Sequence, residues 1–178
     1  YVHTAVGRWF HRKQITAWKL TDFKPHTKVP SSEFEDVTVH VLPLLTDNYC
    51  YLIVDPLTND AVVIDPCVTE PVCDYVNTGN ASGPYNLKAI LSTHGHHDHA
   101  YANKELIEAY PGIKVFGTIE DKVPGVTDVL SMSIDTDFNV GGMTWKAIPF
   151  PGHTTGLVTF LLQPKLSRSF PLVFSGDG

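Results

Sequence analysis

Apolar and polar residues alternate in short runs from residue 37 onwards, which is the pattern of half-buried β-strands. The runs predict strands at residues 37–43, 49–54, 61–64, 88–92, 113–116, 143–148, 157–162 and 171–174. A turn-forming stretch at residues 55–60 joins the second strand to the third. The chain is therefore expected to be rich in β-structure.

Two segments between these strands have the features of helices. Thr69 is a candidate N-cap for a helix that runs to about residue 77. Residues 101–110 form the strongest helical pattern, which Pro111 ends. Loop-forming residues dominate the segment 117–136. Many strands with few helices predict an α/β domain whose sheets are covered by helices.

The first 36 residues differ in composition from the rest. Up to Lys28 they carry six basic residues against one acid, Asp22, together with two tryptophans and two phenylalanines. Arg-rich, acid-poor stretches occur in organelle transit peptides and in segments that face anionic lipid. A solvated extension with some aromatic packing is an equal alternative. We therefore predict a basic N-terminal extension and linker at residues 1–36, which could contact a membrane, and one domain at residues 37–178.

Length, charge and cysteine content limit the class of protein. A chain of 178 residues fits one domain, and its net charge of −6 offers no basic surface for nucleic acid. Three cysteines without a CxxC pair favour buried thiols in a reducing compartment, cytoplasm or mitochondrion, although Cys67 and Cys73 could pair. No apolar run approaches the roughly 20 residues that span a bilayer.

The densest group of candidate metal ligands lies at residues 94–99, whose sequence is HGHHDH. Its four potential ligands are His94, His96, Asp98 and His99. Such density does not fit one helix face, where neighbours are three or four residues apart, and it favours a loop after the strand at residues 88–92. Imidazole and carboxylate groups together suit zinc, iron or manganese. A histidine-rich surface loop that binds metal adventitiously is the alternative.

Two weaker signals follow downstream. His153 lies in a turn, residues 151–156, that contains two glycines. Asp177 follows the apolar strand at residues 171–174. A lone histidine in a turn is usually a surface residue, and an aspartate after a strand is usually a turn former. Their occurrence together with the histidine-rich loop favours a shared metal site.

The HxHxDH loop, the PGHT turn and the SGD strand end together resemble the metallo-β-lactamase superfamily. Within it, residues 45–52 followed by 62–66 resemble the glyoxalase II branch, the hydroxyacylglutathione hydrolases. The resemblance implies an αββα sandwich. It is expected to lack its C-terminal part here, because one further metal-binding histidine and the C-terminal helices of the family would lie beyond Gly178.

The resemblance also implies two divalent metal ions, zinc in the first place, with iron or manganese as alternatives. The residues that it assigns to the metals are His94, His96, Asp98, His99, His153 and Asp177. His94, His96 and His153 would hold one ion. Asp98 and His99 would hold the other, and Asp177 would bridge both. Asp98 and Asp177 would also be the catalytic residues that position the nucleophile. Asp65 and Thr93 are candidates to orient the ligands, and His97 is expected to point away.

The implied reaction is hydrolysis of a glutathione thioester, such as S-lactoylglutathione, by a metal-bound hydroxide. One alternative is a mononuclear-iron persulfide dioxygenase, a related branch of the superfamily. Another is a non-enzymatic binding protein that keeps the fold. Residues 46–49 favour the hydrolase. The ligand set argues against a scaffold, since nothing structural requires six metal-binding residues.

Overall fold

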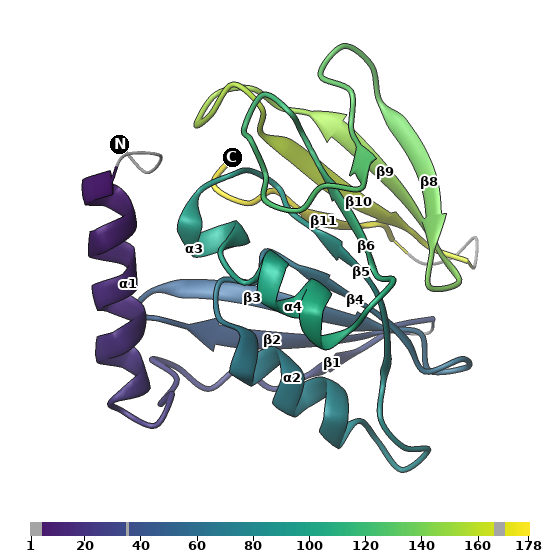
Figure 1. Ribbon diagram of the computed structural model, residues 1–178. Helices are drawn as coiled ribbons and strands as arrows, with labels where there is room; N and C mark the ends of the chain where they lie inside the picture. The colour runs from purple at the N-terminus through teal and green to yellow at the C-terminus, as the bar shows by residue number, and fades with distance from the viewer. Residues whose placement is uncertain (1–4, 35, 166–169) are drawn as a thin grey trace.

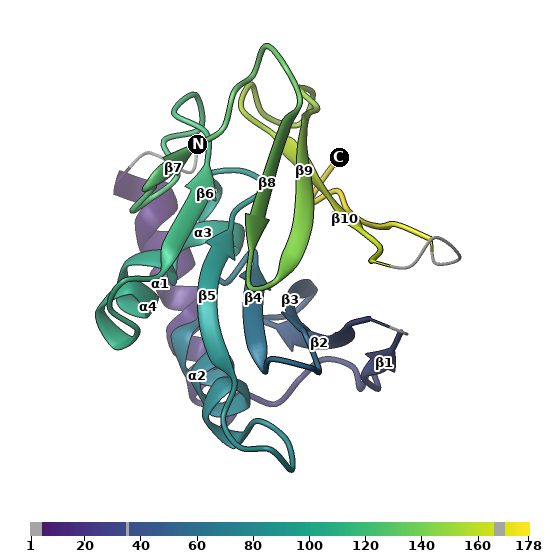
Figure 2. The ribbon, with the colours of Figure 1, turned by 90° about the vertical axis from the view of Figure 1, so that its right-hand side faces the viewer.

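The structure is a computed structural model that describes residues 5–34, 36–165 and 170–178, without the side chains of residues 5–8 and 11. Two β-sheets lie face to face, and helices cover the outer face of the larger sheet (Figure 1). Seen at right angles, the layers follow one another as helices, larger sheet and smaller sheet (Figure 2). The predicted α/β class is confirmed, with one helical layer in the described part of the chain.

The larger sheet has seven strands in the order of the sequence. They are β1 (Ser32–Glu33), β2 (Thr38–Leu44), β3 (Asn48–Val54), β4 (Asp60–Ile64), β5 (Asn86–Leu91), β6 (Lys114–Gly117) and β7 (Asp128–Val129). Strands β1 to β4 pair antiparallel, and β4 to β7 pair parallel. Because parallel strands end at the same edge of a sheet, Asp65 after β4 and Thr93 after β5 become neighbours.

The smaller sheet is antiparallel, in the order β11-β10-β9-β8. Its strands are β8 (Thr136–Val140), β9 (Met143–Pro149), β10 (Val158–Gln163) and β11 (Leu172–Phe174). The sequence did not predict β8, although the two glycines that join it to β9 are a hairpin signal. Gly141 and Gly142 have φ values of 58° and 68°, a left-handed conformation that glycine adopts without steric cost.

Two apolar cores separate the three layers. Val62 and Ile64 of β4 face Trp145 and Phe160 of the smaller sheet, and all four are fully buried. The intervening Val63 packs on the other face, toward the helices. Strand β4 is therefore buried on both faces, which explains why its sequence is a continuous apolar run rather than an alternating one.

Helices α2 (Thr69–Thr78) and α4 (Asn103–Ala109) correspond to the two predicted helices. The predicted N-cap at Thr69 is wrong: the cap position is Val68, without a side-chain capping bond. The Thr69 hydroxyl instead donates to Oε2 of Glu105 at 2.5 Å and so links α2 to α4. Helix α4 is also shorter than the predicted 101–110.

Helix α1 (Ala5–Lys19) lies within the segment predicted as an extension. Ile15 and Trp18, three residues apart, are buried against the larger sheet, and Trp18 Nε1 donates to the carbonyl of Lys24 at 3.1 Å. This helix therefore shares the core between the helices and the larger sheet. The domain boundary after residue 36 stays a prediction.

The three cysteines carry free thiols, as predicted, but the prediction that they are buried holds only for Cys50 and Cys67, because Cys73 is partly exposed. Burial raises the pKa of the Cys50 and Cys67 thiols well above its ordinary value, so both stay protonated at neutral pH. Across the described residues, none of the helices is long and apolar enough to cross a membrane.

Candidate metal centre

The candidate site lies at the edge of the larger sheet where β4 and β5 end. Residues 92–96 after β5 form a loop, as predicted, but the chain then turns into the short helix α3 (His97–Ala100). The prediction that all the ligands lie in a loop is therefore wrong for Asp98 and His99. Loop and helical turn together present side chains in several directions, which a single helix face could not do.

Four of the six predicted metal ligands meet at one point. Their potential ligand atoms all lie within 4.8 Å of one another, and the residues are His94, His96, His153 and Asp177. His94 Nε2 is 3.0 Å from His96 Nδ1, and His96 Nδ1 is 2.9 Å from His153 Nε2. We call this set the four-donor cluster. His94 is buried, whereas His153 and Asp177 are exposed, so the cluster opens to one side.

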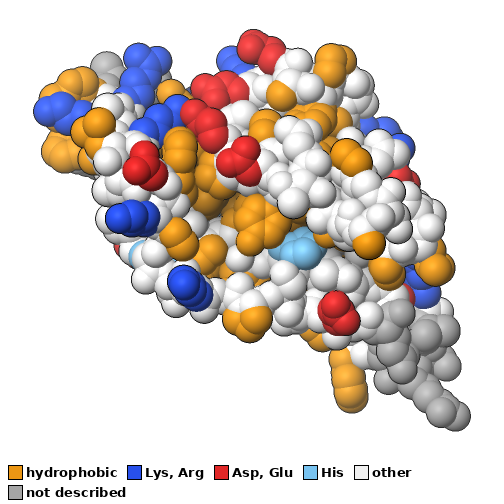
Figure 3. All heavy atoms as spheres, turned by 90° about the horizontal axis from the view of Figure 1, so that it is seen from below, with side chains coloured by type: hydrophobic (Ala, Val, Ile, Leu, Met, Phe, Trp, Pro, Cys, Tyr) orange, Lys and Arg blue, Asp and Glu red, His pale blue; other side chains and the backbone are white. Residues whose placement is uncertain are grey.

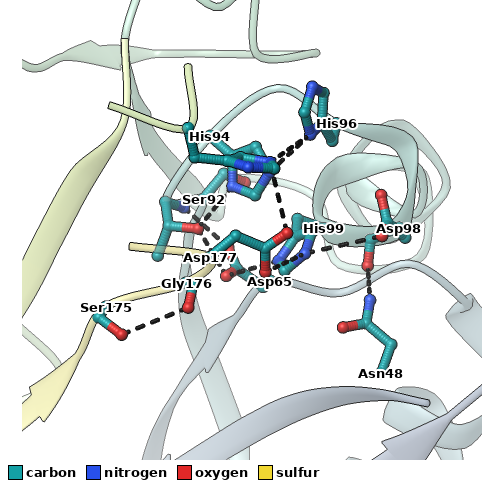
Figure 4. Close-up of polar contacts among 12 residues, drawn as sticks. Asn48, Asp65, Ser92, His94, His96, Asp98, His99, Ser175, Gly176 and Asp177 are labelled. Atoms are coloured by element: carbon teal, nitrogen blue, oxygen red, sulfur yellow. Dashed lines mark hydrogen bonds and ion pairs between the residues drawn. The ribbon is translucent and has the colours of Figure 1, made fainter. Parts of the chain in front are cut away.

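Within the four-donor cluster, Asp177 lies between the histidines and His99 (Figure 4). Its Oδ2 is 3.4 Å from His153 Nε2, and its Oδ1 is 3.2 Å from His99 Nε2. Asp98 stays further out: its Oδ2 is 3.8 Å from His99 Nε2, and its side chain is 45% exposed. The structure thus places His99 next to the cluster and Asp98 at its rim, with Asp177 reaching both sides.

Asp65 and Thr93 orient two of the histidines. Asp65 Oδ1 accepts the Thr93 amide at 2.7 Å, and its Oδ2 accepts the Thr93 hydroxyl at 2.7 Å. His99 Nδ1 donates to the same Oδ2 at 3.0 Å, which leaves His99 Nε2 facing Asp177. Because the Thr93 hydroxyl proton is used on Asp65, His94 Nδ1 donates to Thr93 Oγ1 at 3.1 Å. The lone pair on His94 Nε2 therefore points into the cluster, as a metal ligand requires.

The charges of the site suit a divalent cation. Burial, reinforced by His99, lowers the pKa of His94 to about 4, and burial beside His153 lowers the pKa of His96. Both imidazoles are thus neutral at pH 7 and able to donate an electron pair. Burial alone would lower the pKa of His99, but the carboxylates of Asp177 and Asp65 raise it to about 10. His99 in turn holds the pKa of Asp177 at about 2. Neutral imidazoles beside an ionised carboxylate are a donor set that fits a divalent metal at the four-donor cluster, whereas the protonated His99 would have to lose a proton to bind one.

A cavity of about 380 Å³ opens beside His99 and Asp177. Aromatic side chains from distant parts of the chain line it, among them Phe34, Tyr51 and Phe174. The described residues of its lining include aspartates but no lysine or arginine. A small molecule in this cavity would approach the cluster from the side of Asp177.

Residues 46–49, singled out in the sequence, also contribute to the site. Asn48 Nδ2 donates a hydrogen bond to the backbone carbonyl of Asp98 (Figure 4). His97, expected to point away, lies outside the four-donor cluster, and its ring makes an edge contact with Tyr101 at 5.8 Å between centroids. The sequence did not indicate Asp121, whose carboxylate accepts hydrogen bonds from both histidine-bearing loops. This residue lies in the segment 117–136 and is not part of a motif.

Comparisons with known proteins agree with this arrangement. The family model of the metallo-beta-lactamase superfamily matches residues 45–163. A hydroxyacylglutathione hydrolase from Crocosphaera subtropica is 37% identical over 138 residues, covering 76% of this chain and 51% of that protein. This chain therefore spans about half the length of that curated relative.

Solved structures share the fold. ETHE1 from Myxococcus xanthus superposes with a TM-score of 0.54 at 30% identity, over 64% of this chain and 48% of that one. A B3 metallo-β-lactamase with an active-site glutamic acid gives a TM-score of 0.63 over 97% of this chain and 66% of that one. At 18% identity the second match shows the fold alone. The fold predicted from the resemblance is confirmed.

Proposed function

Because the chain belongs to the metallo-β-lactamase superfamily, we propose that it is a metal-dependent hydrolase that cleaves a glutathione thioester, with S-lactoylglutathione as the model substrate. The observation that carries this proposal is the four-donor cluster, whose ligand atoms lie within 4.8 Å of one another. The similarity to a hydroxyacylglutathione hydrolase supports the substrate class.

The proposed cofactor is a pair of divalent ions, zinc in the first place and iron or manganese as alternatives. Three histidines of the four-donor cluster would hold the first ion, Asp98 and His99 the second, and Asp177 would bridge them. Divalent cations held there supply Lewis-acid chemistry, which lowers the pKa of water and polarises a carbonyl. Asp98 and Asp177 would orient the attacking water, since each carboxylate accepts hydrogen bonds from it. The thiolate leaves without a strong general acid, because its own pKa is only about 8.5.

One observation favours a second candidate, the mononuclear-iron persulfide dioxygenase. Among the described residues a single group of four donors surrounds one point, and the Asp98 carboxylate lies apart from it. Metal content and oxygen uptake separate the two functions. Two metals per protein and thioester turnover without oxygen uptake support the hydrolase. One iron per protein and oxygen uptake with glutathione persulfide support the dioxygenase.

Within the glyoxalase II branch, the proposed nearest relative is the paroxysmal nonkinesigenic dyskinesia protein. The support is in the sequence, where residues 7–14 and 170–177 resemble that protein. The division into an extension, residues 1–36, and a domain, residues 37–178, is proposed on composition.

The proposed membrane contact of the N-terminal segment would involve α1. Trp9 and Phe10 are about half exposed, at 51% and 52%, and the Lys13 ammonium lies 4.0 Å from the centre of the Trp9 ring. Basic and hydrophobic side chains lie side by side at this end of the molecule (Figure 3). Exposed aromatic residues beside lysines suit the surface of an anionic bilayer.

A further inference from the structure

One buried carboxylate joins the two loops that carry the histidines of the four-donor cluster. Asp121 lies in the turn after β6 and is only 6% exposed. Its Oδ2 accepts the amide of Gly95, the residue between His94 and His96, at 3.3 Å. Its Oδ1 accepts the amide of Gly156 at 2.9 Å, on the turn that carries His153.

A third hydrogen bond strengthens the link to the His153 turn. The hydroxyl of Thr154, next to His153, donates to Asp121 Oδ2 at 2.5 Å. Thr118 Oγ1, three residues before Asp121, donates to the carbonyl of Gly156 at 2.8 Å. The turn that contains Asp121 is thus hydrogen-bonded to Thr154 and Gly156, which lie one and three residues after His153.

The two loops are packed against this turn without spare room. A Cβ atom on Gly95 would lie 1.9 Å from the backbone oxygen of Asp121, and one on Gly156 would lie 2.6 Å from Thr118 Oγ1. Such distances are far inside van der Waals contact, so only glycine fits at both places. The spacing of the loops is therefore fixed by backbone contact as well as by hydrogen bonds.

We propose that Asp121 is a positioning residue of the metal site. It holds the loop of His94 and His96 against the turn of His153, and so fixes the distance between the imidazoles that share the first ion. Replacing the carboxylate by an amide turns one of its two acceptor oxygens into a donor, so a buried donor loses its partner and the loops can separate. The inference rests on the proposed binding of metal, but not on the thioester substrate.

A second buried carboxylate, Asp55, is the control that distinguishes an effect on the metal site from a general loss of stability. Asp55 is 1% exposed, accepts the Leu57 amide at 2.9 Å and pairs with Lys165 at 2.7 Å. It follows β3, which runs antiparallel to β4, so it lies at the sheet edge opposite the metal centre. Asp55→Asn and Asp121→Asn therefore remove one charge each from the interior, at opposite ends of the larger sheet.

The test measures the affinity of the full-length, metal-free protein for Zn²⁺ by competition with a chelator, and the absorption spectrum of its Co²⁺ form. We expect Asp121→Asn to weaken the tighter Zn²⁺ site about 10- to 100-fold and to change the Co²⁺ ligand-field bands, because outer-shell contacts of metal ligands have effects of this size. Thr154→Val, which removes one of the three hydrogen bonds, should have a smaller effect in the same direction. Asp55→Asn should lower the melting temperature but leave affinity and spectrum unchanged.

Wild-type affinity and spectrum in Asp121→Asn would overturn the proposal, as would an equal loss of affinity in Asp55→Asn. A wild-type protein that binds no divalent ion would overturn both this inference and the proposed function. Normal metal binding and the expected Asp121→Asn effect without thioester hydrolysis would support this inference and contradict the proposed substrate alone.

Discussion

His96 Nδ1 lies 2.9 Å from His153 Nε2, although 57 residues separate the two histidines. His96 follows a strand of the larger sheet, whereas His153 precedes a strand of the smaller one. A backbone hydrogen bond from Val158 to the carbonyl of Thr93, 2.9 Å long, joins the sheets beside these residues. The candidate metal centre is therefore built at the junction of the two sheets.

His96→Ala should lose metal, because it removes one imidazole from the four-donor cluster. His97→Ala is the matched control: it removes the neighbouring imidazole, which lies outside the cluster. Metal content after dialysis, measured by mass spectrometry, should fall by at least one ion per chain in His96→Ala and stay at the wild-type value in His97→Ala. Full metal content in His96→Ala would contradict the assignment of this ligand.

Gly176→Ala should disturb the site through Thr93. Gly176 has a φ of 58°, and a Cβ atom there would lie 2.4 Å from Thr93 Oγ1. Gly112, with a φ of 89° and nothing within 4 Å of an added Cβ, provides the control for backbone strain alone. In urea denaturation, Gly112→Ala should lower the free energy of unfolding by about 1–2 kcal/mol, the cost of a left-handed alanine.

The loss of unfolding free energy should be larger in Gly176→Ala than in Gly112→Ala. Only Gly176→Ala should also bind metal more weakly, because Thr93 orients His94 and Gly176 precedes Asp177. Equal losses of stability in the two variants, with equal metal affinity, would show that the contact with Thr93 is unimportant.

The free energy of unfolding should fall at acid pH, in part because the Asp55 carboxylate becomes protonated. Burial by itself would raise the pKa of this carboxyl, but hydrogen bonds from Lys165 and Leu57 and the Lys165 charge lower it overall. Because the pKa is lower in the folded chain, the stabilisation is complete above the unfolded-state value, about 4. It is lost as the pH falls through the lower folded-state value.

In urea denaturation at pH 7, Asp55→Asn should be less stable by about 1–3 kcal/mol, the typical cost of a disrupted buried hydrogen bond. Its free energy of unfolding should also fall less steeply than that of the wild type below pH 5. Parallel pH curves for the two proteins would rule out this role for Asp55.

Much of the fold follows from local patterns. Each strand predicted from alternation corresponds to a strand of the structure, and the metal-ligand motifs lie at the ends of those strands. The short strands β1 and β7 have only two residues each, too few for a pattern to show. Helix α1 was missed because its basic residues suggested an extension, while its buried stripe consists of little more than Ile15 and Trp18.

The residues that position the candidate metal ligands were harder to predict than the ligands themselves. Asp65 and Thr93 lie in or next to the motifs that carry the resemblance, and this position was enough to suggest them. Asp121 sits in a loop without a motif, and its role depends on two loops that meet only in the folded protein. Two of its three partners are backbone amides, which leave no signature in the sequence.

The most direct test of the account is hydrolysis of S-lactoylglutathione by the metal-loaded full-length protein, with His94→Ala as the control. His94 is the buried member of the four-donor cluster, so its loss should abolish both metal retention and turnover. The account predicts turnover that disappears on chelation, returns with added metal and is absent in His94→Ala. No turnover by a wild type that binds two metals, or equal turnover in His94→Ala, would contradict it.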